Sequence, residues 1–151
     1  MSEVDRSISH VMVLLQRPDD GQVLTVRHQP ASWHSPGLLT VIDDRLEADE
    51  FLDEGATRKL AEEIGIQVPP DGLRFCQLPH FHAADGERVI GAVFIVRDWD
   101  GEPCNREPRT HSERVWVAPA RGLSPLHLGG PGRFRRRLAP QQHHCPRTAG
   151  R

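Results

Sequence analysis

The sequence predicts an α/β fold, in which a mixed β-sheet is combined with one strong amphipathic helix. The chain has 151 residues, which is the size of a single domain. Short apolar runs rich in β-branched residues recur along it, and such runs are typical of buried strands. One longer segment near the middle instead repeats its apolar residues with the period of a helix.

Three strands are predicted before the helix. Residues 8–15 form an apolar run, which predicts a buried strand. Residues 17–21 have the composition of a turn and residues 23–26 form a second apolar run, so we expect a hairpin. Residues 38–42 predict a third short strand, whereas residues 43–49 are polar and predict an irregular segment.

Residues 50–64 carry the helix. Their apolar residues recur at every fourth position, at Leu52, Ala56, Leu60 and Ile64. Side chains at this spacing lie on one face, which we expect to pack on the sheet. Asp49 is the expected N-cap, because its carboxylate can accept hydrogen bonds from the first free N–H groups. Gly65 fits the end of the helix, and Pro69 and Pro70 prevent its continuation.

Three more strands are predicted after the helix. Residues 73–78 form a short candidate, and residues 89–96 are strongly apolar and predict a central strand. Residues 114–118 alternate between polar and apolar and predict the last strand. The expected order is therefore β-β-β-α-β-β-β, which fits a mixed sheet with one helix.

Charge divides the chain into an acidic body and a basic tail. Residues 119–151 hold seven arginines and no Asp or Glu, whereas residues 1–118 hold 12 basic and 21 acidic residues. We expect one domain over 1–118 and a poorly ordered basic Arg/Pro/Gly-rich tail over 119–151. The alternatives are an end altered by a change of reading frame and an arm that binds nucleic acid through its arginines. Nucleic-acid binding is the less favoured of these.

Composition argues against several classes of protein. No apolar run approaches the roughly 20 residues of a membrane helix, and the polar start of the chain does not resemble a signal peptide. We therefore expect a cytoplasmic protein that does not bind a membrane. The three cysteines are scattered without paired spacing, which indicates neither a disulfide framework nor a zinc ribbon.

The helix holds the residues that suggest chemistry. Lys59, Glu62 and Glu63 are three and four positions apart and so share one face. The adjacent carboxylates Glu62 and Glu63 can both reach one hard cation, and Mg²⁺ readily bridges carboxylates to substrate phosphates. The alternative is structural. Glu54, Arg58 and Glu62 follow at four-residue spacing, which is typical of a solvated helix face with ion pairs.

A known family signature runs through the same segment. Seven residues stand at its characteristic spacing: Glu50, Arg58, Leu60, Glu62, Glu63, Gly65 and Ile66. Residues 44–66 thereby resemble the box of the Nudix hydrolases, G-x5-E-x7-R-E-U-x-E-E-x-G-U, where U is a bulky aliphatic residue. Seven of its nine specified positions match, and the resemblance covers roughly residues 8–118. It implies the family fold, an α/β/α sandwich around a mixed β-sheet, in agreement with the predicted order of elements.

The resemblance also implies a function. It implies a Nudix-type hydrolase that cleaves the pyrophosphate bond of a nucleoside diphosphate derivative with Mg²⁺ or Mn²⁺. Glu62 and Glu63 would be the metal ligands or bases, and Arg58 and Glu50 would be the pair that orients the helix and the preceding loop. The expected partner is a small-molecule nucleotide substrate. A homodimer is one expected assembly, because family members often dimerise.

Two positions depart from the family pattern. Asp44 stands where the family has glycine, so either its carboxylate replaces a backbone group or the loop is remodelled. Lys59 stands where the family has glutamate, which changes that position from a negative to a positive charge. We expect Lys59 to weaken metal binding, because it can bridge to Glu62 or Glu63 and take the place of the ion.

Three interpretations stay open at this point. The matching box residues favour an active but impaired hydrolase. Lys59 and Asp44 favour a catalytically inactive Nudix domain that binds a nucleotide or a protein partner. They also favour a decayed gene product without a selected role.

Overall fold

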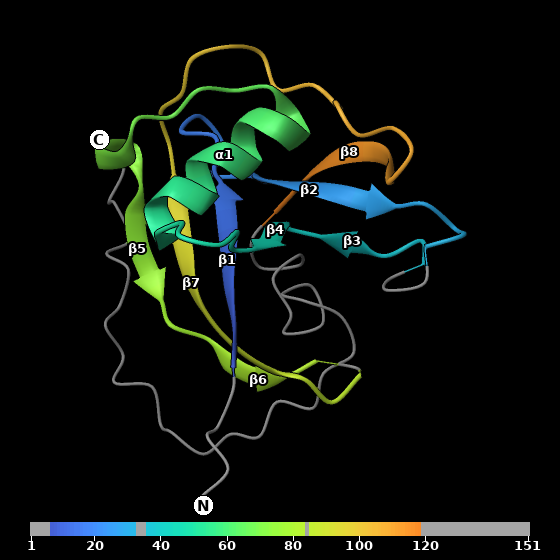
Figure 1. Ribbon diagram of the computed structural model, residues 1–151. Helices are drawn as coiled ribbons and strands as arrows, with labels where there is room; N and C mark the ends of the chain where they lie inside the picture. The colour runs from blue at the N-terminus through green and yellow to red at the C-terminus, as the bar shows by residue number, and fades with distance from the viewer. Residues whose placement is uncertain (1–6, 33–35, 84, 119–151) are drawn as a thin grey trace, which may run out of the picture.

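The computed structural model describes residues 7–32, 36–83 and 85–118 of the chain (Figure 1). The predicted basic tail, 119–151, lies outside the described residues, so the domain boundary at 118 stays a prediction. The elements in chain order are β1 (Ile8–Leu15), β2 (Val23–His28), β3 (Leu39–Thr40), β4 (Ile42–Arg45), α1 (Leu52–Ile64), η1 (Pro70–Gly72), β5 (Arg74–Gln77), β6 (His80–His82), β7 (Arg88–Val96) and β8 (His111–Val117).

The strands form two sheets, and the larger one is mixed. β1 pairs in parallel with β7, from Ile8 opposite Val89 to Leu15 opposite Val96, and antiparallel with β4. β5 and β6 both pair antiparallel with β7, which completes five strands. A second, three-stranded antiparallel sheet has the order β3-β2-β8. The predicted α/β class with a mixed sheet is confirmed.

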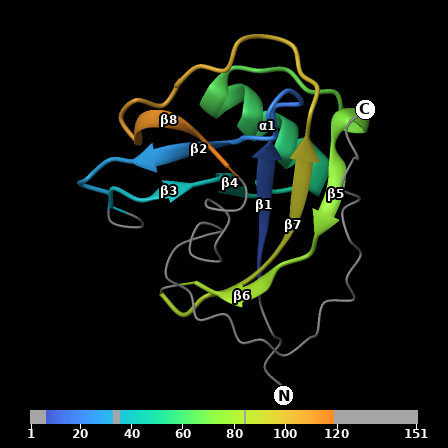
Figure 2. The same cartoon turned by 180° about the vertical axis from the view of Figure 1, so that it is seen from behind.

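One face of the larger sheet is covered by α1 (Figure 1, Figure 2). Side chains alternate along β1, so Val11 and Val13 join the core cluster under the helix while Met12 joins the cluster on the opposite face. Leu60 and Ile64 of the helix are fully buried in the first cluster. Each such side chain contributes about 1.5–3 kcal/mol by leaving water. This packing fixes the polar residues that project from the same helix and strands.

Residues 8–15 and 89–96 form strands as predicted, but the expected hairpin is wrong. β1 and β2 belong to different sheets and share one isolated bridge, between Gln16 and Val23. Both edges of β1 are already paired, to β4 and to β7, so β2 pairs with β8 instead. The turn composition of residues 17–21 is the same for a hairpin and for a chain that passes from one sheet to another.

The segment before the helix also differs from expectation. Residues 38–45 form two strands in different sheets, β3 and β4, and β4 includes part of the segment predicted as irregular. The helix begins at Leu52 with Phe51 as N-cap, because Glu54 turns back and its Oε2 accepts from the Phe51 N–H at 2.8 Å. Asp49 instead adopts a left-handed φ of 64°. Within the described ranges, no helix is long and apolar enough to cross a membrane.

Candidate metal site

Adjacent aspartates of β4 point to opposite faces of the larger sheet. In the pairing of β1 with β4, Asp43 stands opposite Met12 and Asp44 opposite Val11. Since side chains alternate along a strand, Asp44 lies on the face covered by α1. Its Oδ2 is 3.5 Å from Lys59 Nζ. Of the two expectations for Asp44, the geometry favours the one in which it contributes a carboxylate.

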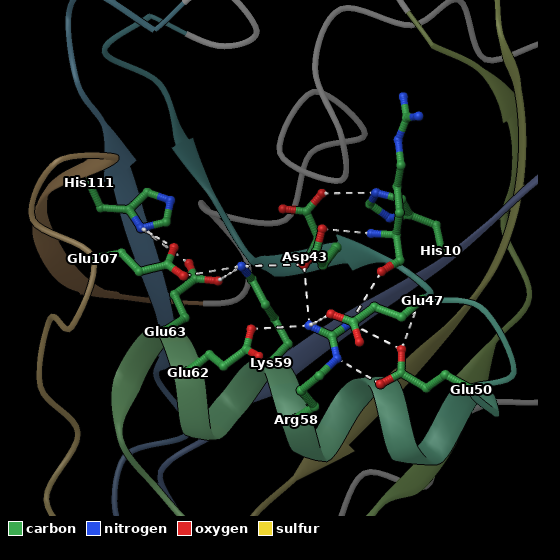
Figure 3. Close-up of polar contacts among 12 residues, drawn as sticks. His10, Asp43, Glu47, Glu50, Arg58, Lys59, Glu62, Glu63, Glu107 and His111 are labelled. Atoms are coloured by element: carbon green, nitrogen blue, oxygen red, sulfur yellow. Dashed lines mark hydrogen bonds and ion pairs between the residues drawn. The ribbon is translucent and has the colours of Figure 1, made fainter.

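Arg58 ties the loop between β4 and α1 to the helix (Figure 3). Its Nε and Nη2 donate to the two carboxylate oxygens of Glu50 at 2.6 and 3.0 Å, and its Nη1 donates to Glu62 Oε2 at 3.1 Å. Gly55 leaves room for this arrangement, because a Cβ there would lie 2.4 Å from Leu46 Cδ2 and 3.0 Å from Glu50 Oε2. The pair expected to orient helix and loop is therefore in direct bidentate contact.

Lys59 lies among three carboxylates, two of which Figure 3 labels. Its Nζ is 3.5 Å from an oxygen of each of Asp44, Glu63 and Glu107. Burial lowers the pKa of Lys59, but these carboxylates outweigh burial, so the net pKa is raised and the ammonium stays charged. Lys59, which stands where the family has glutamate, thus places a positive charge among these three acidic side chains.

A turn before β8 adds two residues whose roles were missed from the sequence. The N–H groups of Thr110 and His111 donate to the carbonyl oxygen of Glu107 at 3.0 and 2.9 Å. Asn105 stabilises this turn, because its Oδ1 accepts from the Glu107 N–H and its Nδ2 donates to His111 O. The four-residue spacing of Glu107 and His111 was the available signal, but only the fold places both beside Glu63.

Glu63, Glu107 and His111 form a group that could hold a metal ion. One donor atom of each lies within 4.8 Å of the others. His111 Nδ1 is 3.3 Å from Glu63 Oε1 and 4.0 Å from Glu107 Oε2, yet this buried nitrogen has no hydrogen-bond partner. Carboxylate oxygens and an imidazole nitrogen are ordinary ligands of divalent metals. The residues therefore fit a divalent ion, and the 29 % exposure of the Glu107 side chain gives it a route from solvent.

Burial shifts the protonation equilibria of four groups here. It raises the pKa of Glu63 to about 8, although Lys59 opposes the shift, and it lowers the pKa of His111 to about 4. Burial likewise raises the pKa of Asp43 to about 7 and lowers the pKa of His10 to about 4. At neutral pH the His111 ring is therefore uncharged and offers a lone pair to a cation.

The four residues predicted to form the site fall into two groups. Glu50, Arg58 and Glu62 belong to one ionic network, whereas Glu63 faces Lys59 and His111 (Figure 3). The Glu62 side chain is 49 % exposed and that of Glu63 is 2 % exposed. Successive side chains on a helix point about 100° apart, so these adjacent carboxylates engage different partners.

Comparison with known proteins finds the same fold. No curated protein matches the chain. The chain is similar to the crystal structure of a MutT NUDIX hydrolase from Burkholderia pseudomallei, at a TM-score of 0.67 and 20 % identity, over 76 % of this chain and 85 % of that one. It is similar to the MutT protein of Methanosarcina mazei at a TM-score of 0.63 and 22 % identity, over 84 % and 88 % of the two chains.

A third similar structure is the NUDIX domain of Shewanella oneidensis NrtR, which was crystallised with ADP ribose. Its TM-score is 0.62 at 19 % identity, over 78 % of this chain and 76 % of that one. At such low identity, these structural similarities establish a shared fold alone. The family model of the NUDIX domain matches residues 7–138, which is most of the chain. The chain therefore belongs to the NUDIX family.

Proposed function

We propose that the chain is a Nudix-type hydrolase that uses a divalent metal to cleave the pyrophosphate bond of a nucleoside diphosphate derivative. The observation that carries this proposal is the group of Glu63, Glu107 and His111, in which α1 meets the turn before β8. Membership of the NUDIX family supports the reaction class. The ADP ribose complex of the similar NrtR domain supports a nucleotide ligand.

Each of the polar residues has a proposed task. Glu63, Glu107 and His111 would hold the ion, which when bound neutralises phosphate charge and activates water. Glu62 would act at the exposed edge of the same helix, as a further ligand or a base, after releasing Arg58. Arg58, through its bidentate contact with Glu50, would hold the preceding loop against the helix.

Lys59 favours a second function, that of an inactive Nudix domain which binds a nucleotide or a protein partner without cleaving it. Its ammonium already compensates part of the negative charge of Asp44, Glu63 and Glu107. A fixed positive charge beside these carboxylates opposes the entry of a divalent cation. The two functions differ in whether the unchanged chain turns over any substrate.

The test is a hydrolysis panel of nucleoside triphosphates, nucleotide sugars and ADP ribose. Products would be separated by anion-exchange chromatography after incubation with Mg²⁺, Mn²⁺ or Co²⁺, each with and without EDTA. The variants are Glu63→Gln, Glu107→Gln and Lys59→Glu. Glu102→Gln is the matched control, because Glu102 is an exposed glutamate on the same loop as Glu107.

We expect slow, EDTA-sensitive turnover of at least one substrate by the unchanged chain. Glu63→Gln should reduce this turnover by about 10²–10⁴-fold, the range for losing one group of the reacting centre. Glu102→Gln should leave it unchanged, and Lys59→Glu should increase it. Turnover confined to Lys59→Glu would support the inactive binding domain instead. Turnover that persists in Glu63→Gln would contradict the proposed site.

A further inference from the structure

Lys59 and His111 lie near different oxygens of the same two carboxylates, those of Glu63 and Glu107. Lys59 Nζ lies 3.5 Å from Glu63 Oε2 and 3.5 Å from Glu107 Oε1. His111 Nδ1 lies 3.3 Å from Glu63 Oε1 and 4.0 Å from Glu107 Oε2. The ammonium therefore occupies one side of the carboxylate pair, and its presence leaves the oxygens on the imidazole side to another cation (Figure 3).

His111 Nδ1 has the character of a ligand atom. The side chain is 5 % exposed, and Nδ1 is buried without a hydrogen-bond partner, since its contact with Glu63 Oε1 lacks hydrogen-bond geometry. Leaving such an atom unsatisfied costs about 1–3 kcal/mol. The ring is held by its surroundings, with the His28 ring packed edge-on at 5.0 Å and the Asn105 amide bound to the His111 carbonyl.

We propose that Glu63, Glu107 and His111 form a mixed nitrogen–oxygen site that selects a first-row transition metal ion over Mg²⁺. Imidazole nitrogen is a ligand for Zn²⁺, Co²⁺ and their neighbours, whereas Mg²⁺ requires oxygen ligands. Three protein donors with the remaining positions open to water or substrate is the usual composition of a catalytic zinc site. The inference deepens the proposed function by naming its metal, and so rests on it for the use of the ion in hydrolysis.

Distances within the group suit a transition metal. Ligand atoms bound to one tetrahedral ion at about 2.0–2.2 Å lie about 3.4 Å apart. The three donor atoms here already lie within 4.8 Å of one another. Small rotations of Glu107, whose side chain is the most exposed of the three, would close the remaining difference.

Co²⁺ binding tests the inference without any substrate. The full-length chain would be titrated with Co²⁺, and the d–d absorption bands would report binding and coordination number. We expect one Co²⁺ per chain at this site. Binding should be at least about tenfold weaker in His111→Gln, because even the loss of a residue that only supports a metal ligand weakens affinity by about 10–100-fold. His10→Gln is the matched control, because His10 Nδ1 is likewise buried without a hydrogen-bond partner and the ring lies beside a carboxylate, with Nε2 3.8 Å from Asp43 Oδ2.

Two further measurements guard against trivial outcomes. His127, His143 and His144 would be replaced by alanine in every protein compared, so that the tail histidines add no site. Far-UV circular dichroism checks that His111→Gln folds. Independently of that variant, long-range ¹H–¹⁵N spectra of the imidazole rings should show Zn²⁺ shifting Nδ1 of His111, and a hundredfold excess of Mg²⁺ should not reverse the shift.

The results that would overturn the inference are specific. They are equal Co²⁺ affinity in His111→Gln and the unchanged chain, a His111 Nδ1 resonance that ignores Zn²⁺, or displacement of Co²⁺ by an equal concentration of Mg²⁺. Failure of the hydrolysis panel with Co²⁺ still bound through His111 would instead contradict the proposed function alone.

Discussion

Replacing Lys59 by methionine separates two effects of its ammonium: it compensates nearby carboxylates and it competes with a metal ion. Methionine keeps an unbranched apolar stem and removes the ammonium, with its charge and its N–H donors. Breaking a buried ion pair costs about 3–5 kcal/mol. Glu63, which is 2 % exposed and 3.5 Å from Nζ, loses the most. Because the pKa of Glu63 is raised to about 8, the pair is fully ionised only above that pH. There we expect the lower end of this range, a loss of about 3 kcal/mol in the free energy of unfolding in EDTA.

The same substitution should strengthen metal binding. Two unit charges about 4 Å apart interact by about 1 kcal/mol even in water, and the interaction with a divalent ion is twice that. Removing the ammonium should therefore tighten Co²⁺ binding by at least about tenfold, which corresponds to about 1.4 kcal/mol. Co²⁺ at about 100 times its Kd should then restore about 2.7 kcal/mol of the lost stability.

Urea titrations followed by tryptophan fluorescence measure both effects, once in EDTA and once in Co²⁺. Arg27→Met is the control, because Arg27 pairs with Glu113 on an exposed surface of β2 and β8, where a pair contributes about 0–1 kcal/mol. Equal stability of Lys59→Met and the unchanged chain in EDTA would show that the ammonium does not stabilise these carboxylates. Co²⁺ binding to Lys59→Met no tighter than to the unchanged chain would show that the ammonium does not compete with the ion.

Three other changes have expected outcomes. Arg58→Lys should cost about 2 kcal/mol in urea titrations, because lysine cannot reproduce the two hydrogen bonds to Glu50; a loss below about 0.5 kcal/mol would count against this. Gly65→Ala should cost about 1–2 kcal/mol or more, because φ is 70° and a Cβ would lie 3.0 Å from two side-chain atoms. Gly37→Ala, with φ 68° and open space around it, isolates the backbone part, and equal costs would contradict the steric part. In EDTA, stability should be flat near about pH 5–6 and fall from about pH 6.5 to 8, because the folded chain keeps protons on two carboxyl groups with pKa values raised to about 7 and about 8 that the unfolded chain has lost. The region near pH 5–6 is flat because the two buried histidines, whose pKa values are lowered to about 4, lose stability as the pH drops from about 6.5 to 4, and this offsets the opposite trend of the carboxyl groups. Glu63→Gln should reduce the loss on the alkaline side, and an unchanged pH profile in that variant would contradict the shift.

Local periodicity explains what the sequence could predict. The recurrence of Leu52, Ala56, Leu60 and Ile64 predicts one buried helix face. The structure buries the last three but leaves Leu52, the first residue of the helix, 38 % exposed. Gly65 ends the helix in a left-handed conformation, as expected for a glycine at that place. Arg58 and Glu50 could be paired in advance because their spacing matched a known signature. Each of these features depends on residues close together in the chain.

Long-range pairing explains what the sequence could not predict. β1 and β2 were expected to pair because they are neighbours in sequence, yet β7 and β4 occupy the edges of β1. Glu107 and His111 reach the site through the turn before β8, far from the helix in sequence. The sequence predicts one role for Glu62 and Glu63 because they are adjacent, whereas the helix turns Glu62 toward solvent and Glu63 into the core.

The most direct test of the metal site is anomalous diffraction from crystals of the full-length chain soaked in Co²⁺. Data collected on both sides of the cobalt absorption edge would locate the ion without reference to activity. We expect one peak bonded to Glu63, Glu107 and His111 Nδ1, with Lys59 on the opposite oxygens of the carboxylates. A peak held by Glu62 without His111, or no peak beside Glu63, would contradict it.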